Sequence, residues 1–219
     1  MALESTVFVV DDDSGVRRSL KALGRSHGLV VETYASGQAF LTAYDPGRPG
    51  CLLLDVRLAG RGGLDIQDKL RRRGCALPVI VMTGHGDVAA SVRAFRAGAI
   101  DFMEKPVAPR ALIRRIKEAL AIDEERRRVG SEQESIAKRV ARLTPRERQV
   151  ADQVVTGKTS RQVAKALGIS ARTVEGHRHR MLEKMDVRSV VQLANQLRKL
   201  SSGSAIGAVA SRPRSPDAS

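Results

Sequence analysis

Four short apolar segments in the first half of the chain have the pattern of buried parallel β-strands. They span residues 5–10, 51–54, 77–82 and 99–103, and they are rich in Val, Ile and Leu. A strand of a parallel sheet is covered on both faces, so it reads as a near-continuous apolar run and not as an alternation. The pattern therefore predicts an α/β domain built on a parallel sheet.

Chemically active side chains follow each of these segments. Carboxylates follow the first and close the second, a hydroxyl follows the third and an amine follows the fourth, namely Asp11, Asp12, Asp13, Asp55, Thr83 and Lys105. Ligands bind outside the carboxyl ends of the strands in such sheets, so these side chains are expected to meet. Together they suit a divalent cation and a phosphoryl group. A single aspartate after a strand is ordinarily a helix cap, so the prediction rests on all four positions.

Four sequence pieces resemble a known family. VVDDDSG, LLLDVRLAGRGGLD, VIVMTGHGD and AIDFMEKP, in this order and spacing, resemble the receiver domain of two-component response regulators over residues 5–122, above all in the NarL/FixJ group. The resemblance implies a flavodoxin-like, doubly wound, five-stranded parallel sheet. It implies that Asp55 accepts a phosphoryl group, which Thr83 and Lys105 contact. Thr83 and Phe102 are then the residues of the switch, and the peptide bond after Lys105 is commonly cis.

The same resemblance implies a Mg²⁺ site among the carboxylates. Mg²⁺ takes about six oxygen ligands and keeps several waters, and it neutralises the repulsion between a carboxylate and a phosphoryl group. We expect Asp12 and Asp55 to ligate directly, the main-chain carbonyl of Arg57 to add a third ligand, and Asp11 to act through water. Without the metal, repulsion between these carboxylates is expected to raise the pKa of one of them.

Three nearby features have open or different interpretations. Asp13 fits the cap of the first helix better than a metal ligand. His85, between two glycines, is either a loop residue or a contact to the phosphoryl group or a partner. The loop over residues 57–63 reads RLAGRGG, where the family usually has a proline and a methionine. Glycine admits many more backbone states, so we expect this loop to be looser.

Residues 143–197 predict four short helices in a second domain. Thr144 starts the first helix, because its hydroxyl is followed by a proline and, at the third helical position, by a glutamate. A second helix is expected over residues 160–167. Gly168 then permits a turn and Ser170 caps the next helix. Two helices joined by such a short turn have helix-turn-helix geometry.

This segment resembles the LuxR-type DNA-binding domain, whose pattern LTxRExxV…GxxxxxIAxxLxISxxTVxxH it follows with Val163 in place of the usual Ile. The third helix is expected to pack through Val174, Met181, Leu182 and Met185. Its opposite face, directed to the major groove, is then Thr173, Glu175, Gly176, His179 and Arg180, of which by analogy Glu175, Gly176 and His179 approach base edges. Phosphate contacts are expected from Lys158, Arg161, Lys165, Arg172, Arg178 and Lys184. His177 has either a structural or a DNA-binding role.

The distribution of charge agrees with a nucleic-acid partner for the second domain. Residues 143–200 hold 12 Lys and Arg against 5 Asp and Glu, a net of +7, whereas residues 1–107 hold 14 against 12, a net of +2. Clustered basic residues are the electrostatic signature of nucleic-acid binding. A merely solvated basic face explains the charge equally well if charge is taken alone.

The 219 residues predict two domains with a connection and a tail. We assign residues 1–122 to the receiver domain, 123–142 to a charged, helical linker with a break at Gly130, and 143–200 to the all-α, four-helix helix-turn-helix domain. Residues 201–219, rich in Ser, Gly, Ala and Pro, are expected to be disordered. The absence of an apolar run of about 18 residues predicts a cytoplasmic protein without a membrane partner. Cys51 and Cys75 are expected to be reduced core thiols.

These observations predict a transcription regulator and not an enzyme. A cognate sensor histidine kinase phosphorylates Asp55, the protein forms a homodimer, and the dimer binds double-stranded DNA and acts on RNA polymerase. One alternative is a regulator whose receiver stays unphosphorylated and serves only for dimerisation. Another is a phosphatase of the haloacid dehalogenase type, whose aspartate nucleophile follows the first strand in a DxDx(T/V) pattern from which DDDSG departs.

Overall fold

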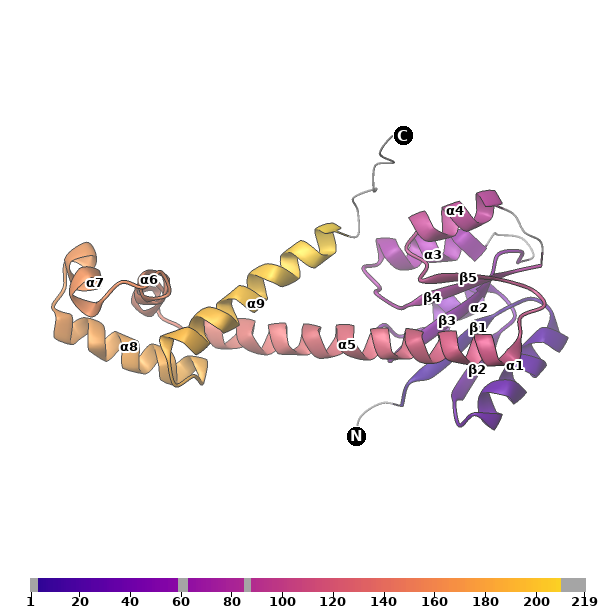
Figure 1. Cartoon of the computed structure of the whole chain (residues 1–219), viewed down its shortest axis with the longest axis horizontal. Helices are drawn as coiled ribbons and strands as arrows, with labels where there is room; N and C mark the ends of the chain where they lie inside the picture. The colour runs from indigo at the N-terminus through magenta and orange to yellow at the C-terminus, as the bar shows by residue number, and fades with distance from the viewer. Residues whose placement is uncertain (1–3, 59–62, 85–87, 210–219) are drawn as a thin grey trace. The chain divides into compact units, whose positions relative to one another are not determined.

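The computed structural model describes residues 4–58, 63–84 and 88–209. The chain forms two compact units, Met1–Arg128 and Val129–Ser219, each with its own core (Figure 1). Among the described residues, no helix is both long enough and apolar enough to cross a membrane.

The first unit is built on a five-stranded parallel sheet in the order β2-β1-β3-β4-β5. The strands are β1 (Thr6–Val10), β2 (Val30–Tyr34), β3 (Gly50–Asp55), β4 (Val79–Thr83) and β5 (Asp101–Glu104). This is the flavodoxin-like order, which confirms the predicted fold. Sequence reasoning located four of these strands and missed β2, because its VVETY sequence buries only Val31.

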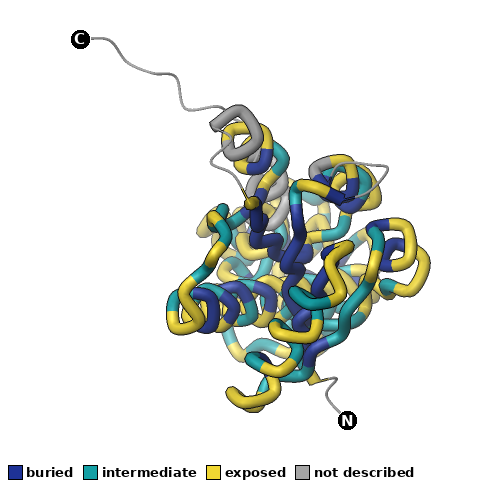
Figure 2. The backbone as a smooth tube through the Cα atoms, turned by 90° about the vertical axis from the view of Figure 1, so that its right-hand side faces the viewer, coloured by how far each residue is buried: buried dark blue, intermediate teal, exposed yellow. Residues whose placement is uncertain are grey.

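Helices cover both faces of the sheet, and they are α1 (Ser14–Ser26), α2 (Gly37–Ala43), α3 (Gly63–Arg72), α4 (Val88–Arg96) and α5 (Pro109–Ala141). Successive side chains of a strand point to opposite faces. In β1, Phe8 packs with α2, α3 and α4, whereas Val7 and Val9 pack with α1 and α5. Figure 2 marks the buried residues along the backbone. The three central strands β1, β3 and β4 are buried throughout, which explains their continuous apolar pattern.

Helix α5 corrects the predicted linker. It is a single helix of 33 residues that continues through Gly130, where a break was predicted. One helical glycine costs only about 1 kcal/mol relative to alanine. Extending an existing helix avoids the nucleation penalty, and ion pairs such as Lys138 with Glu134 (2.7 Å) support the continuation. The two units divide residues 123–142 between them: Asp123 is buried in the first unit and Ile136 in the core of the second.

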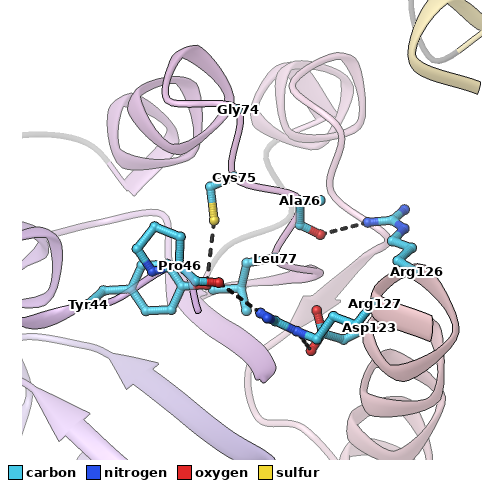
Figure 3. Close-up of a pocket in the computed structure, with 9 residues that line it drawn as sticks. All are labelled: Tyr44, Pro46, Gly74, Cys75, Ala76, Leu77, Asp123, Arg126 and Arg127. Atoms are coloured by element: carbon cyan, nitrogen blue, oxygen red, sulfur yellow. Dashed lines mark hydrogen bonds and ion pairs between the residues drawn. The ribbon is translucent and has the colours of Figure 1, made fainter. Parts of the chain in front are cut away.

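The first turn beyond the predicted receiver boundary is tied to the N-terminal end of the sheet. Asp123 Oδ2 accepts hydrogen bonds from the N–H of Gly50 (2.8 Å) and from Arg127 Nε (2.7 Å). Arg127 also donates to the carbonyls of residues 46, 47 and 48 at 2.6 to 3.1 Å. Figure 3 shows these residues around a cavity of about 220 Å³ lined by Tyr44, Pro46, Gly74, Cys75, Ala76, Leu77, Asp123, Arg126 and Arg127. Residue 123 is therefore part of the receiver unit and not of a linker.

Both cysteines are free thiols of the first unit, as predicted. Cys51 is fully buried in β3, and burial raises its pKa to about 12. Cys75 donates a hydrogen bond to the Tyr44 hydroxyl at 3.5 Å (Figure 3).

The second unit contains α6 (Pro145–Val154), α7 (Ser160–Leu167), α8 (Ala171–Met185) and α9 (Val190–Val209). The Thr144 capping box is confirmed: the Thr144 N–H donates to Glu147 at 2.8 Å, and the Glu147 N–H donates to the Thr144 hydroxyl at 3.3 Å. Gly168 ends α7 with φ 65°, and the Ser170 hydroxyl accepts the N–H of Thr173 at 3.0 Å. The α7–turn–α8 pair has the predicted helix-turn-helix form.

The end of α9 differs from the prediction. The backbone is helical up to Val209, whereas the sequence predicted disorder from residue 201. A helix already nucleated over residues 190–200 can extend one residue at a time without a new nucleation penalty. Residues 210–219 lie outside the described residues.

Candidate functional site

The ends of β1 and β3 bring three carboxylates together. Oxygens of Asp11, Asp12 and Asp55 all lie within 4.8 Å of one another. The two strands are neighbours, with Val10 opposite Leu54, so the residues that follow them meet at the point where the strand order reverses. Asp11 is fully buried, Asp55 is 7% exposed and Asp12 is exposed.

Lys105 links the two buried carboxylates. Its Nζ donates to Asp11 Oδ2 at 2.7 Å and to Asp55 Oδ2 at 2.6 Å. The residue is placed by its own N–H, which bonds the Thr83 carbonyl at 2.6 Å, and its bond to Pro106 is cis as expected. Burial alone would lower the pKa of Lys105, but the hydrogen bonds and charges of the two carboxylates together raise it. The ammonium therefore stays charged at neutral pH.

The pKa of Asp11 is raised, in the direction expected for a crowded carboxylate without metal. The main cause is burial, however, and repulsion from Asp55 contributes least. Hydrogen bonds from Lys105 and from the Asp13 N–H oppose the rise. Repulsion between the carboxylates, which the sequence led us to expect, thus raises the pKa of Asp11 less than the burial of this residue does.

The donor set fits a hard divalent cation. Three carboxylates against the one ammonium of Lys105 leave a local excess of negative charge in a partly buried site, and Mg²⁺ prefers carboxylate oxygens. Arg57 follows Asp55 closely, and its N–H donates to Asp55 Oδ1 at 2.9 Å. Its carbonyl as a metal ligand stays a prediction.

The loop between β1 and α1 holds the acidic pair in place. Asp13 caps α1 by accepting the N–H groups of Gly15 (2.6 Å) and Val16 (3.2 Å), which lower its pKa; its predicted role as a cap is confirmed. Arg17 NH1 donates to the carbonyls of Asp11 (2.7 Å) and Asp12 (2.9 Å). Sequence reasoning missed Arg17, since an arginine in the first turns of an amphipathic helix is ordinarily a solvated residue.

The two residues predicted to form the switch lie on adjacent strands. Thr83 is the last residue of β4 and is buried, one position beyond Met82, which is opposite Asp55. Phe102 lies opposite Val81 on β5, is partly buried, and packs on the core under α2, α3 and α4. The structure thus brings Thr83 to the edge of the acidic pocket. His85 and loop residues 59–62 lie outside the described residues.

In the second unit, α8 presents the face predicted to read DNA. Val174, Met181 and Met185 are fully buried and Leu182 is partly buried, as expected. The opposite side of α8 is exposed at Thr173, Glu175, Gly176, His179 and Arg180. The basic residues at which phosphate contacts were predicted on and before α7 and at the start of α8 are exposed too: Lys158, Arg161, Lys165 and Arg172.

Two of the predicted phosphate contacts are engaged inside the protein. Lys184 Nζ bonds Glu147 Oε2 at 2.7 Å, and Glu147 is only 2% exposed. Burial alone would raise the pKa of Glu147, but hydrogen bonds from Lys184 and Thr144 lower it. Arg178 is partly buried and bonds the Ser160 hydroxyl at 3.2 Å. The sequence predicted only phosphate contacts for both residues, because a helical pattern does not reveal which neighbouring helix faces each side chain.

Comparisons with known proteins agree with both the acidic pocket of the first unit and the helix-turn-helix of the second. Residues 7–117 match the response regulator receiver domain, and residues 141–197 match the luxR family of bacterial regulatory proteins. The transcriptional regulatory protein FixJ of Azorhizobium caulinodans is 43% identical over 187 residues, which cover 85% of this chain and 89% of that protein. The transcriptional regulatory protein TdiR of Thauera aromatica is 40% identical over 189 residues, which cover 86% and 83%.

Solved structures give the same result. The response regulator StyR has a TM-score of 0.83 at 39% identity, and the match covers 90% of this chain and 99% of that chain. Full-length FixJ from B. japonicum has a TM-score of 0.56 at 33% identity, covering 92% and 99%. With its acidic pocket on a receiver sheet and its helix-turn-helix unit, the chain belongs to the NarL/FixJ family of two-component response regulators, which are transcriptional regulators.

Proposed function

We propose that a sensor histidine kinase phosphorylates Asp55 and that this modification controls dimerisation and sequence-specific DNA binding. The observation that supports the proposal most strongly is the placement of Asp55, a nearly buried carboxylate with a charged ammonium at 2.6 Å and two further carboxylates beside it. A carboxylate needs such cationic help, since it and the incoming phosphoryl group are both negative.

The chain's own residues have separate tasks in the phosphoryl transfer. A carboxylate oxygen of Asp55 attacks the phosphorus of a phosphohistidine, the P–N bond breaks, and the imidazole leaves with a proton. Asp11, Asp12 and Asp55 would hold Mg²⁺, which supplies neutralising charge on the phosphoryl oxygens. The ammonium of Lys105 and the hydroxyl of Thr83 then contact those oxygens.

The same change is proposed to reach a dimerisation surface. Thr83 ends β4, and Phe102 lies on the neighbouring strand β5, opposite Val81. A shift of the Thr83 hydroxyl towards the phosphoryl group is proposed to open space for the aromatic ring. Helix α4, which packs beside β5, exposes two large apolar side chains, Val92 (44% exposed) and Phe95 (52% exposed). Exposed apolar side chains next to a moving strand are suited to a second copy of the chain.

The exposed face of α8 is proposed to enter the major groove. Glu175 and His179 offer an acceptor and an imidazole to base edges. Gly176 supports this placement, because a β-carbon there would have the Arg180 side chain, at 3.9 Å, as its nearest contact among the described residues outside its own stretch of helix backbone. Packing within the protein therefore gives no reason for a helix-weakening glycine, and close approach of DNA does. The exposed basic residues are proposed to contact phosphates and position the domain, and RNA polymerase is the expected downstream partner.

The alternative is a receiver that stays unphosphorylated and serves only for dimerisation. Incubation with acetyl phosphate and Mg²⁺, followed by intact-mass measurement, separates the two. We expect one phosphoryl group on the wild-type protein and none on Asp55→Asn. The control Asp65→Asn, which changes an exposed aspartate of α3, should label normally. A wild-type protein that takes no label, or label retained in Asp55→Asn, would contradict the proposal.

A further inference from the structure

The hydroxyl of Ser160 lies between the two charged residues of α8 that face α7. Ser160 is the first residue of α7, and its Oγ donates a short hydrogen bond to Glu175 Oε1. The same oxygen accepts a hydrogen bond from Arg178 NH1 at 3.2 Å. Arg178 Nε and Glu175 Oε2 are 3.8 Å apart, so the three side chains close a ring of contacts. The ring joins the first turn of α7 to the exposed face of α8.

The capping of α7 does not require this hydroxyl. Thr159 is the N-cap, and its capping box with Gln162 already satisfies the first turn: the Thr159 hydroxyl accepts the Gln162 N–H, and the Thr159 N–H donates to the Gln162 side chain at 2.8 Å. Among the described residues, the Ser160 hydroxyl has its hydrogen-bond partners, Glu175 and Arg178, on α8. Its contacts therefore act on the recognition helix and not on the helix that carries it.

The ring leaves the carboxylate available and turns the guanidinium inward. The Glu175 side chain is 63% exposed, whereas that of Arg178 is 26% exposed. A glutamate on an exposed helix face ordinarily samples several rotamers, and freezing it on DNA binding has an entropic cost. Contacts from Ser160 and Arg178 remove part of that freedom beforehand. Each carboxylate oxygen still has a lone pair for a base-edge donor.

We infer that Ser160 is a positioning residue for sequence readout: it holds the Glu175 carboxylate in the orientation that accepts from one base, with the cytosine N4 amino group as the expected donor. The inference rests on the proposed binding of DNA through α8. It also changes what is expected of Arg178, which acts on Glu175 and not only on phosphate. Loss of Ser160 should reduce discrimination at one base pair, while affinity for unrelated DNA changes little. Loss of Arg178 should reduce the same discrimination and, through its phosphate contact, also the affinity for all DNA.

The test starts from duplex DNA with a randomised segment, from which phosphorylated full-length protein selects its preferred sequence. Glu175→Ala then identifies the base pair that Glu175 reads, as the position whose preference is lost. At that position Ser160→Ala should lower the preference for the selected base about 3- to 10-fold. Ser160→Thr, which keeps the hydroxyl, should restore the preference. Ser201→Ala, an exposed serine of α9, is the matched control.

A double-mutant cycle separates positioning from a general effect on the fold. In the Glu175→Ala background, Ser160→Ala should have no further effect on preference, because it acts through the missing carboxylate. Preference unchanged in Ser160→Ala, or an equal loss with and without Glu175, would overturn the inference while leaving DNA binding intact. If the wild-type protein enriches no sequence at all, the proposed sequence-specific binding fails, and the inference fails with it.

Discussion

At the scale of single residues, Lys105 is the cation that balances the resting pocket. It lies 2.6 and 2.7 Å from two buried carboxylates, and these contacts raise its pKa. Carboxylates placed this close without a cation repel each other and have lost part of their hydration. The stability of the metal-free protein therefore depends on this side chain.

Replacing it tests that dependence. Lys105→Gln should lower the free energy of unfolding in metal-free buffer by about 2–4 kcal/mol, since it leaves the buried carboxylates without their cation. Mg²⁺ should restore part of the loss, because a ligand that binds only the folded state stabilises it. Urea unfolding with and without Mg²⁺ measures both effects. The control Lys117→Gln, at an exposed position of α5, should change neither the free energy of unfolding nor its response to Mg²⁺. A Lys105→Gln protein as stable as the wild type would show that the ion pairs of Lys105 do not contribute to stability.

Gly176 separates stability from DNA binding. Gly176→Ala should raise the free energy of unfolding by about 0.5–1 kcal/mol, because alanine favours the helix and the added methyl group only comes into ordinary contact with the Arg180 side chain at 3.9 Å. It should weaken DNA binding if the backbone approaches the groove there. Gly130→Ala is the matched control, because a methyl group at this position of α5 also clashes with no described atom. This variant should be more stable than the wild type and should bind DNA unchanged. Tight DNA binding by Gly176→Ala would mean that α8 enters the groove by another face.

At the scale of elements, helix α5 and strand β3 are joined by Asp123. This carboxylate is 3% exposed, accepts the N–H that starts β3 and pairs with Arg127. The contacts lie at the opposite end of β3 from Asp55. They fix the start of the strand whose other end carries the site.

We expect Asp123→Ala to destabilise the receiver unit by about 2–4 kcal/mol, since it leaves the buried N–H of Gly50 without an acceptor and Arg127 without its partner. Asp123→Asn should lose less, because the amide oxygen still accepts from Gly50. Thermal unfolding compares the two variants, and Glu125→Ala, at an exposed position of the same helix turn, provides the baseline. Equal stability of Asp123→Ala and Glu125→Ala would mean that this contact does not hold β3.

The capping box of α6 gives the second unit a predictable dependence on pH. The pKa of Glu147 is lowered in the folded state, so its stabilising effect is complete above its ordinary value near 4.5 and is lost as the pH falls through the lower, folded value. Glu147→Gln keeps the acceptor for the Thr144 N–H but loses the charge that holds Lys184. It should lower stability by about 1–2 kcal/mol at pH 7. The difference from wild type should shrink below pH 4.5 in urea titrations, and a constant difference would rule out the ion pair as its cause.

At the scale of the whole molecule, phosphorylation is expected to shift a monomer–dimer equilibrium and not the fold. Turning a dimer population of about 1% into about 99% requires about 5.5 kcal/mol. The exposed apolar side chains of α4 are the proposed source of interface area. The shift in the monomer–dimer equilibrium then requires two copies of the chain, and phosphorylation of Asp55 in each copy causes it.

Sedimentation of phosphorylated and unmodified protein at matched concentration measures this shift. We expect a larger species after phosphorylation, and Phe95→Ser should abolish it while Asp55 still takes the label. Arg93→Ser, a polar change on the same helix, should leave dimerisation largely intact. Identical distributions for both forms of the wild type across the micromolar range would remove dimerisation from the mechanism.

The sequence alone determined the features that depend on local periodicity and on strand ends. Continuous apolar runs predicted β1, β3, β4 and β5. The polar residues at the ends of these runs were predicted to form the site, namely Asp11, Asp55, Thr83 and Lys105. Predicting that these residues lie close together needs no knowledge of tertiary contacts, because the carboxyl ends of parallel strands lie at the same edge of their sheet. The capping signals of α6 and α8 were readable for a similar reason, since each cap bonds the residue three positions further along the chain.

Only the tertiary structure decided which side chains meet across elements. Lys184 pairs with Glu147, which is far from it in the chain, whereas its position on the helix suggested only a phosphate contact. Arg178 bonds a serine of α7, and Asp123 bonds the start of β3. The physical reason is that the position of a charged side chain on a helix does not tell whether it is solvated or paired. Its pairing depends on how a neighbouring element is rotated and how closely it approaches, and the local pattern of the chain does not contain this.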